Sequence, residues 1–259
     1  MKSCADHGVP VIVLDRPNPI GGEVIEGNML DRAFNSFVGV APLPVRHGMT
    51  LGELALYLNE SEGVNCELEV VKMEGWRRCD DWRATGLTWI PPSPNMPTFE
   101  TATMYPGTCF FEGTNVSEGR GTPRPFEQIG APFIDGSLLA NELERQQLAG
   151  ADATPVSFVP SMGKHTGRAC SGVFLGVVDP GCFRAVATGL QVLITVARLW
   201  PQEFSWHVPA KGIHNFDKLA GTDGLRLAID AGADLDSILQ RWEMEQSGFV
   251  DSRRSYLLY

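Results

Sequence analysis

The chain has 259 residues, of which 43% are hydrophobic and 20% charged. This composition is that of a folded globular protein, not of a disordered or fibrous one. Lys and Arg number 21 against 31 Asp and Glu, which gives a formal net charge of −10. Because so acidic a chain without a basic cluster repels a phosphate backbone, we expect no nucleic-acid partner. The most apolar stretch, residues 185–197, is shorter than the roughly 20 residues that cross a bilayer, so we expect no membrane span.

The first residues contain no apolar signal-peptide segment, which leaves the localisation open between the cytoplasm and export from a longer precursor. Six cysteines are scattered along the chain without a C-x-x-C pair. This spacing argues against a zinc ribbon or a thioredoxin-like site. We therefore expect reduced, mostly buried thiols, no bound metal and no cofactor.

The first third of the chain predicts strand, loop, helix and strand. The continuous apolar run 9–14 is typical of a strand covered on both faces of a parallel sheet. Asp15, Arg16 and Asn18 follow it, where α/β folds place binding residues. Thr50 and Glu53 have the spacing of a capping box and predict a helix through residue 59, and residues 67–73 predict a second strand.

Residues 89–132 are rich in proline and glycine, and ordered loops of this length are usually functional. The densest polar segment, 112–122, holds two carboxylates, Glu112 and Glu118, with an amide, hydroxyls and a guanidinium. Such a mixture of donors and acceptors suits a sugar, although a loop bonded to itself is the alternative.

Two shorter clusters are further candidates. Arg46 and His47 directly precede the capped helix, where an anionic group would be favoured, although His47 could equally pack or cap. Asn95 lies between two prolines that would hold it on a rigid turn, or that turn is purely structural. His165, in a glycine-flanked loop, is a weaker candidate.

The second half predicts an α+β pattern. Residues 150–155 resemble a linker, which suggests one domain over 1–150 and a second over 151–259. Strands are predicted at 156–159 and 173–178, a long helix over 183–197, and two further helices near 224–231 and 234–246. Residues 256–259 suggest an edge strand.

The chain contains no H-E-x-x-H, P-loop, G-x-S-x-G or EF-hand motif. Metalloprotease, NTPase and serine hydrolase activities therefore have no support. Carboxylates without a metal motif leave acid–base chemistry on a glycosidic bond as the leading enzymatic interpretation.

Several long motifs, in this order, resemble the DUF1343 family, whose characterised members are exo-β-N-acetylmuramidases of the NamZ type. The resemblance extends from about residue 9 to residue 259. It rests on Leu14-Asp15-Arg16-Pro17-Asn18-Pro19, Arg46-His47-Gly48-Met49-Thr50, Pro92-Ser93-Pro94-Asn95-Met96-Pro97, Tyr105-Pro106-Gly107-Thr108 and Glu112-Gly113-Thr114-Asn115-Val116-Ser117-Glu118-Gly119-Arg120-Gly121-Thr122.

The resemblance implies an α/β fold, with part of a Rossmann-like domain followed by a smaller α/β domain and a site in the cleft between them. It implies release of N-acetylmuramic acid from the non-reducing end of peptidoglycan fragments, with sugars or muropeptides as partners. Glu112 and Glu118 become the best catalytic carboxylates. The lactyl carboxylate of the sugar would be bound by Arg46, Arg120, Arg124 or Lys164. The substrate-binding residues expected are Asp15, Arg16, Asn18, Arg46, His47, Asn95, Tyr105, Thr114, Asn115, Ser117, Arg120 and His165.

The sequence departs from the family pattern in one respect. Family members carry well over a hundred residues before the segment matched here, including a Pro-Glu-His-Gly motif whose Glu is the expected principal acid, and these 259 residues contain no such motif. Three interpretations stay open: a muramidase or the greater part of one, a non-catalytic relative that binds muramic acid, and a truncated product without independent function.

Overall fold

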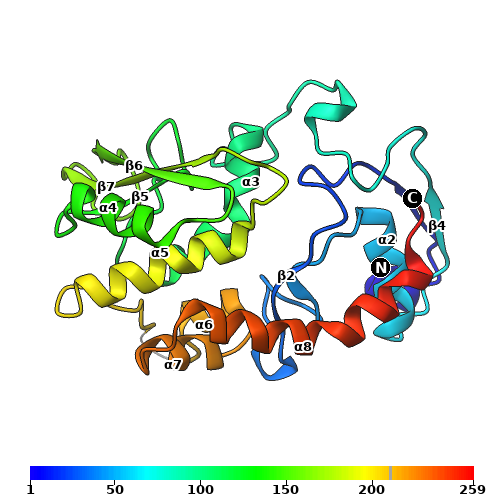
Figure 1. Cartoon of the computed structure of the whole chain (residues 1–259). Coiled ribbons are helices and arrows are strands. Elements are labelled where there is room, and N and C mark those ends of the chain that lie inside the picture. The colour runs from blue at the N-terminus through cyan, green and yellow to red at the C-terminus, as the bar shows by residue number, and fades with distance from the viewer. Residues whose placement is uncertain (210–211) are drawn as a thin grey trace.

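The computed structural model describes residues 1–209 and 212–259 and confirms a mixed α/β fold. Figure 1 shows two lobes. The N-terminal segments, together with both chain ends, form one of them, and a three-stranded sheet with its helices forms the other. A long helix at the C-terminal end of the chain runs from below the second lobe into the first.

The N-terminal lobe is built on a parallel strand pair. β1 (Val11–Leu14) pairs with β4 (Leu68–Val71), and α2 (Leu51–Ser61) lies between them in sequence and packs on both. The capping box at the start of α2 has both of its hydrogen bonds, so this helix begins where the sequence predicts. A short helix, α1 (Lys2–Asp6), precedes β1.

The prediction that the first strand is covered on both faces was wrong. Alternate side chains of β1 point to solvent, with Ile12 62% and Leu14 68% exposed. The β1–β4 pair forms a two-stranded sheet, and α2 covers only one face of it. An apolar run predicts that a segment forms a strand. Whether both faces of that strand are buried depends on which other elements pack against it.

A second strand pair lies between the lobes. β2 (Glu26–Met29) runs antiparallel to β3 (Pro44–Arg46). β2 also packs against α5 (Ala185–Leu199) and α8 (Leu235–Arg253). This pair therefore connects the N-terminal lobe to helices of the C-terminal half.

The second lobe contains an antiparallel sheet of order β5-β7-β6, from β5 (Gln128–Ala131), β6 (Ala151–Phe158) and β7 (Cys170–Val177). α4 (Gly136–Gln146) packs on this sheet and on α5, and α3 (Phe99–Thr108) packs along α5. The main core lies between these elements and is formed by fully buried side chains such as Phe110, Leu139, Val173 and Leu190.

The remaining helices complete the chain. α6 (Asn215–Ala220) and α7 (Gly224–Asp230) lead into α8, whose 19 residues exceed the predicted helix. Short 3₁₀ turns occur at Arg32–Phe34, Arg83–Thr85, Cys109–Gly113 and Arg254–Tyr256. The predicted edge strand at 256–259 is absent: the last of these turns ends at Tyr256, and residues 257–259 form neither helix nor strand. No helix within the described residues is long and apolar enough to cross a bilayer.

The expected linker at 150–155 is instead the beginning of β6. β5 and α4, before residue 150, share one sheet and core with β6 and β7, after it. A division of the chain at residue 150 stays a prediction, and this shared sheet weighs against it. The sequence pattern was misread because small and polar residues are common both in linkers and in partly exposed strands.

Candidate functional site

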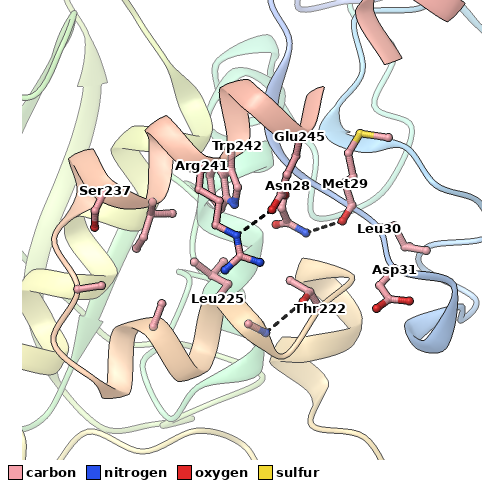
Figure 2. A pocket seen from close by; sticks show the side chains of 14 residues that line it. Asn28, Met29, Leu30, Asp31, Thr222, Leu225, Ser237, Arg241, Trp242 and Glu245 are labelled. Atoms are coloured by element: carbon pink, nitrogen blue, oxygen red, sulfur yellow. Dashed lines mark hydrogen bonds and ion pairs between the residues drawn. The ribbon is translucent and has the colours of Figure 1, made fainter. Parts of the chain in front are cut away.

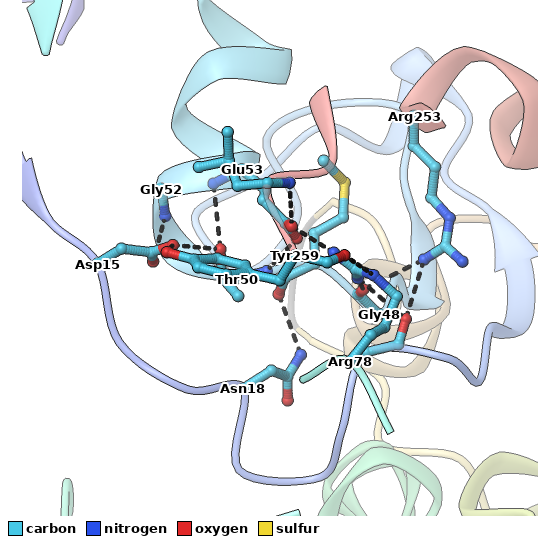
Figure 3. A network of polar contacts seen from close by, with 12 residues as sticks. Asp15, Asn18, Gly48, Thr50, Gly52, Glu53, Arg78, Arg253 and Tyr259 are labelled. Carbon is cyan, nitrogen blue, oxygen red and sulfur yellow. Dashed lines mark hydrogen bonds and ion pairs between the residues drawn. The ribbon is translucent and has the colours of Figure 1, made fainter. Parts of the chain in front are cut away.

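Asp15, the first polar residue after β1, serves the local structure. Its carboxylate accepts hydrogen bonds from the Thr50 hydroxyl and the Gly52 amide, both at 2.7 Å, and from the Tyr259 hydroxyl at 2.9 Å. Figure 3 shows these bonds gathered at the start of α2. The helix N-terminus stabilises the negative charge, so Asp15 fixes α2 and the last residue to the strand end.

Glu53 extends the same network into the interior. Its side chain is fully buried, receives the backbone amide of Leu258 at 2.8 Å and forms an ion pair with Arg78. Arg78 and Arg253 both donate to the carbonyl of Gly48 (Figure 3). Two guanidinium groups therefore hold the turn that carries His47.

Asn18 and Arg16, the other residues after β1, differ in placement. The Asn18 amide donates to the carbonyl of Met49 at 3.0 Å, and its oxygen accepts from the amide of Ile20. Asn18 lines a cavity, whereas Arg16 is exposed and lines none of the cavities described below. The structure thus brings Asn18 to the candidate site and leaves Arg16 outside it.

Arg46 forms a buried ion pair that the sequence patterns did not indicate. Its guanidinium donates to Glu26 at 2.9 Å and to the carbonyl of Ile20 at 2.7 Å. Glu26 also accepts from the amides of Ala185 and Val186 at the start of α5. The Nε of Arg46 is buried and has no acceptor among the described residues. One buried donor of this arginine therefore has no partner within the described residues.

His47 is neutral in this environment. Its Nδ1 accepts from the amide of Met49 at 3.1 Å. Burial, with a smaller contribution from the positive charge of Arg253, lowers the pKa of His47 to about 4. A neutral imidazole acts as a hydrogen-bonding group here, and it adds no positive charge for an anion.

Asn18, Arg46, His47 and Tyr105 line one cavity of about 280 Å³, which we call the Tyr105 cavity. Trp89 and other apolar side chains complete its wall. A neighbouring cavity of about 380 Å³ shares His47 and Tyr105 with it. Four predicted residues from three separate segments thus line one hollow surface, whose volume is near the lower end for small-molecule sites.

The two predicted catalytic carboxylates form a charged cluster with two cations. Arg120 contacts Glu112 at 2.9 Å and Glu118 at 3.4 Å, and Lys164 contacts Glu118 at 2.8 Å. Lys164 also donates to the carbonyls of Phe111 and Val116. Glu118 is 5% exposed, whereas the Glu112 side chain is 26% exposed and therefore accessible.

The environment separates the roles of the two carboxylates. Burial raises the pKa of Glu112, and the negative charge of Glu118 raises it further, against the lowering effect of Arg120.

Burial lowers the pKa of Lys164, an effect that its ion pair with Glu118 opposes. Burial also raises the pKa of Tyr105 to about 12, with contributions from Cys109 and Glu112, so the Tyr105 hydroxyl stays protonated. The ring of Phe126 connects the charged cluster to Tyr105, since it meets the Tyr105 ring edge-on at 4.8 Å between centroids and lies 5.3 Å from the guanidinium of Arg120.

Other residues of the 112–122 motif are bonded to the protein itself. The Thr114 hydroxyl donates to the carbonyl of Phe111, and Ser117 accepts from the amide of Gly119. The Asn115 amide pairs with the backbone of Glu203 and Ser205. These three residues support the loop in the way the self-bonded alternative describes.

His165 and Asn95 lie outside the cluster. The Nε2 of His165 is 2.7 Å from the carbonyl oxygen of Asn115 and holds two loops together. Asn95 is half-buried and does not line the Tyr105 cavity, although its neighbour Met96 does. Across the described ranges, 1–209 and 212–259, no group of three or more His, Cys, Asp or Glu side chains is arranged to hold a metal ion.

The sequence patterns did not single out three residues that organise the site: Glu26, Arg78 and Tyr259. Each of them bonds to residues far away in the chain. Glu26 stands in a short strand, and no local pattern marks a carboxylate that will meet a helix starting at residue 185. A buried charge with its partner elsewhere in the chain has no signature in the sequence.

Comparison with known proteins places the chain in a family. The C-terminal model of exo-β-N-acetylmuramidase NamZ matches residues 103–259, and the N-terminal model matches residues 1–100. The whole chain is 44% identical to the peptidoglycan β-N-acetylmuramidase NamZ of Bacillus subtilis (strain 168) and spans 62% of the length of that relative.

Two solved structures agree. A DUF1343 family protein from Bacteroides fragilis NCTC 9343 superposes with a TM-score of 0.92 at 32% identity, over the whole of this chain and 68% of that one. A second such protein from the same organism gives 0.77 at 30% identity, over the whole chain and 69% of its own. The motifs, the fold and these matches confirm the resemblance found in the sequence: the chain belongs to the exo-β-N-acetylmuramidase NamZ family, also known as DUF1343.

Proposed function

We propose that this chain acts as an exo-β-N-acetylmuramidase, which releases N-acetylmuramic acid from the non-reducing end of peptidoglycan fragments. The observation that carries the proposal is the pairing of an accessible carboxyl, Glu112, with a buried and ion-paired carboxylate, Glu118. Most glycosidases use a pair of carboxyl groups whose different environments give them different pKa values and therefore different roles.

These 259 residues do not contain the Pro-Glu-His-Gly motif that carries the expected principal acid of the family, so Glu112 is the carboxyl that we assign as general acid within this chain. Its raised pKa keeps a larger fraction of the carboxyl protonated near neutral pH than an exposed Glu would have. A protonated Glu112 donates its proton to the glycosidic oxygen as the bond between that oxygen and C1 of the sugar breaks. A water molecule adds to C1 and loses one proton, which gives free N-acetylmuramic acid and the shortened fragment. Arg120 then balances the negative charge that remains on the carboxylate, because it is already bonded to it.

Glu118 acts on Glu112 through its charge. Lys164 and Arg120 bind its two oxygens, so it is held in place and is not free to reach a sugar. We therefore assign Glu118 as a positioning residue, which raises the pKa of Glu112 and orients Arg120. The protonated Tyr105 hydroxyl lines the Tyr105 cavity and donates a hydrogen bond to the bound sugar.

The Tyr105 cavity is the proposed binding site for the muramic acid ring. Its unpartnered donor, the Nε of Arg46, suits the lactyl carboxylate of this sugar. Asn18 supplies an amide and His47 an imidazole for hydroxyl or acetamido groups, and Trp89 offers an apolar wall. The mixture of a charged donor, neutral polar groups and an aromatic ring suits a carboxylated amino sugar.

The experiment is hydrolysis of a chromogenic β-N-acetylmuramide by the purified chain. Glu112→Gln is expected to lower kcat by at least about 10²-fold. Glu144→Gln, an exposed carboxylate on α4, is the matched control and should leave the rate unchanged. Glu118→Gln should move the basic limb of the kcat–pH profile to lower pH, because Glu112 loses a negative neighbour.

A binding measurement separates activity from recognition. Calorimetry should show that N-acetylmuramic acid binds more tightly than N-acetylglucosamine, which lacks only the lactyl group, and that Arg46→Gln removes this difference. Binding of N-acetylmuramic acid without any turnover would reject the hydrolase and leave a glycan-binding protein. Equal binding of both sugars would reject the role of Arg46.

A further inference from the structure

A second cavity lies away from the Tyr105 cavity, against α8. It has a volume of about 570 Å³ and is formed by β2, the residues around α7 and the first half of α8. Figure 2 shows its lining side chains. No residue of the proposed muramidase site lines it.

The polar part of the cavity lining contains the buried side-chain amide of Asn28, whose oxygen has no hydrogen-bond partner among the described residues. Asn28 is 2% exposed, and its Nδ2 donates to the carbonyl of Ala220 at 2.6 Å and to that of Met29 at 3.0 Å. Two carbonyl partners fix the amide orientation, since a flipped amide would place oxygen against oxygen. The Oδ1 of Asn28 accepts no hydrogen bond from the described residues. A buried acceptor without a partner is costly, so this oxygen favours a ligand that brings an N–H group.

A guanidinium at the same cavity has donors to spare. Arg241 donates through Nε to Glu245 at 2.8 Å, and the Nη atoms have no acceptor among residues 1–209 and 212–259. Its Nη2 reaches toward Gly224, where an added Cβ would lie 3.9 Å from it. Figure 2 shows Arg241 and Asn28 among the side chains that line the cavity. This fork suits a carboxylate, which two parallel N–H groups bind well.

The rest of the lining supplies a second anion and an apolar surface. The Oδ1 of Asp31 accepts from the amide of Ala33, which leaves its other carboxylate oxygen available. Leu225, Ile238 and Trp242 are at most 6% exposed and form the apolar floor. Cationic, anionic and apolar features therefore lie around one space of ligand size.

We propose that this cavity binds an apolar α-amino acid, or the end of a short peptide with the same groups. The ammonium or N–H group meets the Oδ1 of Asn28 and the carboxylate of Asp31. The carboxylate of the ligand meets the Nη atoms of Arg241, and its side chain packs on Leu225 and Ile238. The proposal is independent of the muramidase activity, because it uses none of the residues of that site.

Titration calorimetry of the full chain with L-leucine and with L-alanyl-L-leucine tests this binding and distinguishes a free amino acid from a peptide. Saturable binding of at least one of them is expected. Two blocked probes examine the groups separately: N-acetyl-L-leucine lacks the ammonium and L-leucinamide lacks the carboxylate. Each should bind at least about tenfold more weakly than leucine, because each loses a charge-assisted contact.

Variants link any binding to the cavity. Arg241→Gln should weaken binding of leucine by about tenfold or more and should make leucine and leucinamide equivalent. Arg145→Gln, an exposed arginine on α4 with a similar intrahelical ion pair, is the control and should bind as the parent chain does. Arg241 is 65% exposed, so its replacement leaves the fold intact. Absence of binding by both probes, or unchanged binding by Arg241→Gln, overturns the proposal.

Discussion

The ammonium group of Lys164 lies 2.8 Å from the carboxylate of Glu118 and joins the loop after β6 to the polar motif that follows α3. The same ammonium group donates to two backbone carbonyls of that motif. Lys164 therefore holds the shape of the segment that carries Glu112. The pair contributes to the stability of the loop as well as to the electrostatics of the proposed acid.

Replacing Lys164 by Met should destabilise the fold by about 2–3 kcal/mol, because among the described residues Glu118 then keeps Arg120 alone as its cationic partner. Urea unfolding of the purified variant measures this change. The double variant Lys164→Met, Glu118→Gln should recover part of the loss, since no buried charge then lacks its partner. Additive effects of the two substitutions would show that the pair does not interact.

Replacing Glu26 by Ala should cost about 3 kcal/mol of unfolding free energy, because Arg46 becomes an unpaired buried charge and the first amides of α5 lose their acceptor. Thermal and urea denaturation of the variant both measure this loss of unfolding free energy. The matched control is Glu142→Ala, a surface carboxylate paired with Arg145 and Arg198, which should leave stability unchanged. An equal loss in the two variants would contradict the special role of Glu26.

His47 should make the protein less stable in mild acid. Its pKa is lowered to about 4 in the folded state from the ordinary 6.5, so the unfolded chain binds a proton that the folded chain does not. Stability is therefore lost as the pH falls from about 6.5 toward 4, by about 2 kcal/mol between about pH 7 and pH 5. His47→Gln should lose this part of the pH dependence. Parallel stability–pH curves for the variant and the parent would disprove the assignment.

Two glycines should respond to alanine in opposite directions. A Cβ at Gly189 in α5 would collide with the backbone of Gly107 in α3, so Gly189→Ala should destabilise by about 1–3 kcal/mol. A Cβ at Gly248 in α8 would meet no described atom within 4 Å, so Gly248→Ala should stabilise by about 0.5–1 kcal/mol through helix propensity. Urea unfolding of both variants checks the sign. Similar values would mean that α3 and α5 can separate at little cost.

The sequence predicted helices correctly where the pattern that specifies them lies within a short segment. The capping box of α2 and the apolar stripe of α5 predicted these helices, because both signals lie within a few turns of the chain. It misjudged α3, since Pro106 and Gly107 inside that helix are typical of loops. The tertiary contact with α5 overrides this preference, because Gly107 permits the close approach of the two helices.

For the candidate site, the sequence by itself determined the chemistry and the family. The long polar motifs specified which carboxylates, amides and guanidinium groups are present, and their order identified the NamZ family. Only the tertiary structure decided which of them line a cavity and which are bonded within the fold: Asn18 and Tyr105 line the Tyr105 cavity, Asp15 caps a helix, and Glu112 stays accessible beside Glu118. The physical reason is that burial and charge pairing depend on partners up to 244 residues away, as between Asp15 and Tyr259, and no local pattern specifies them.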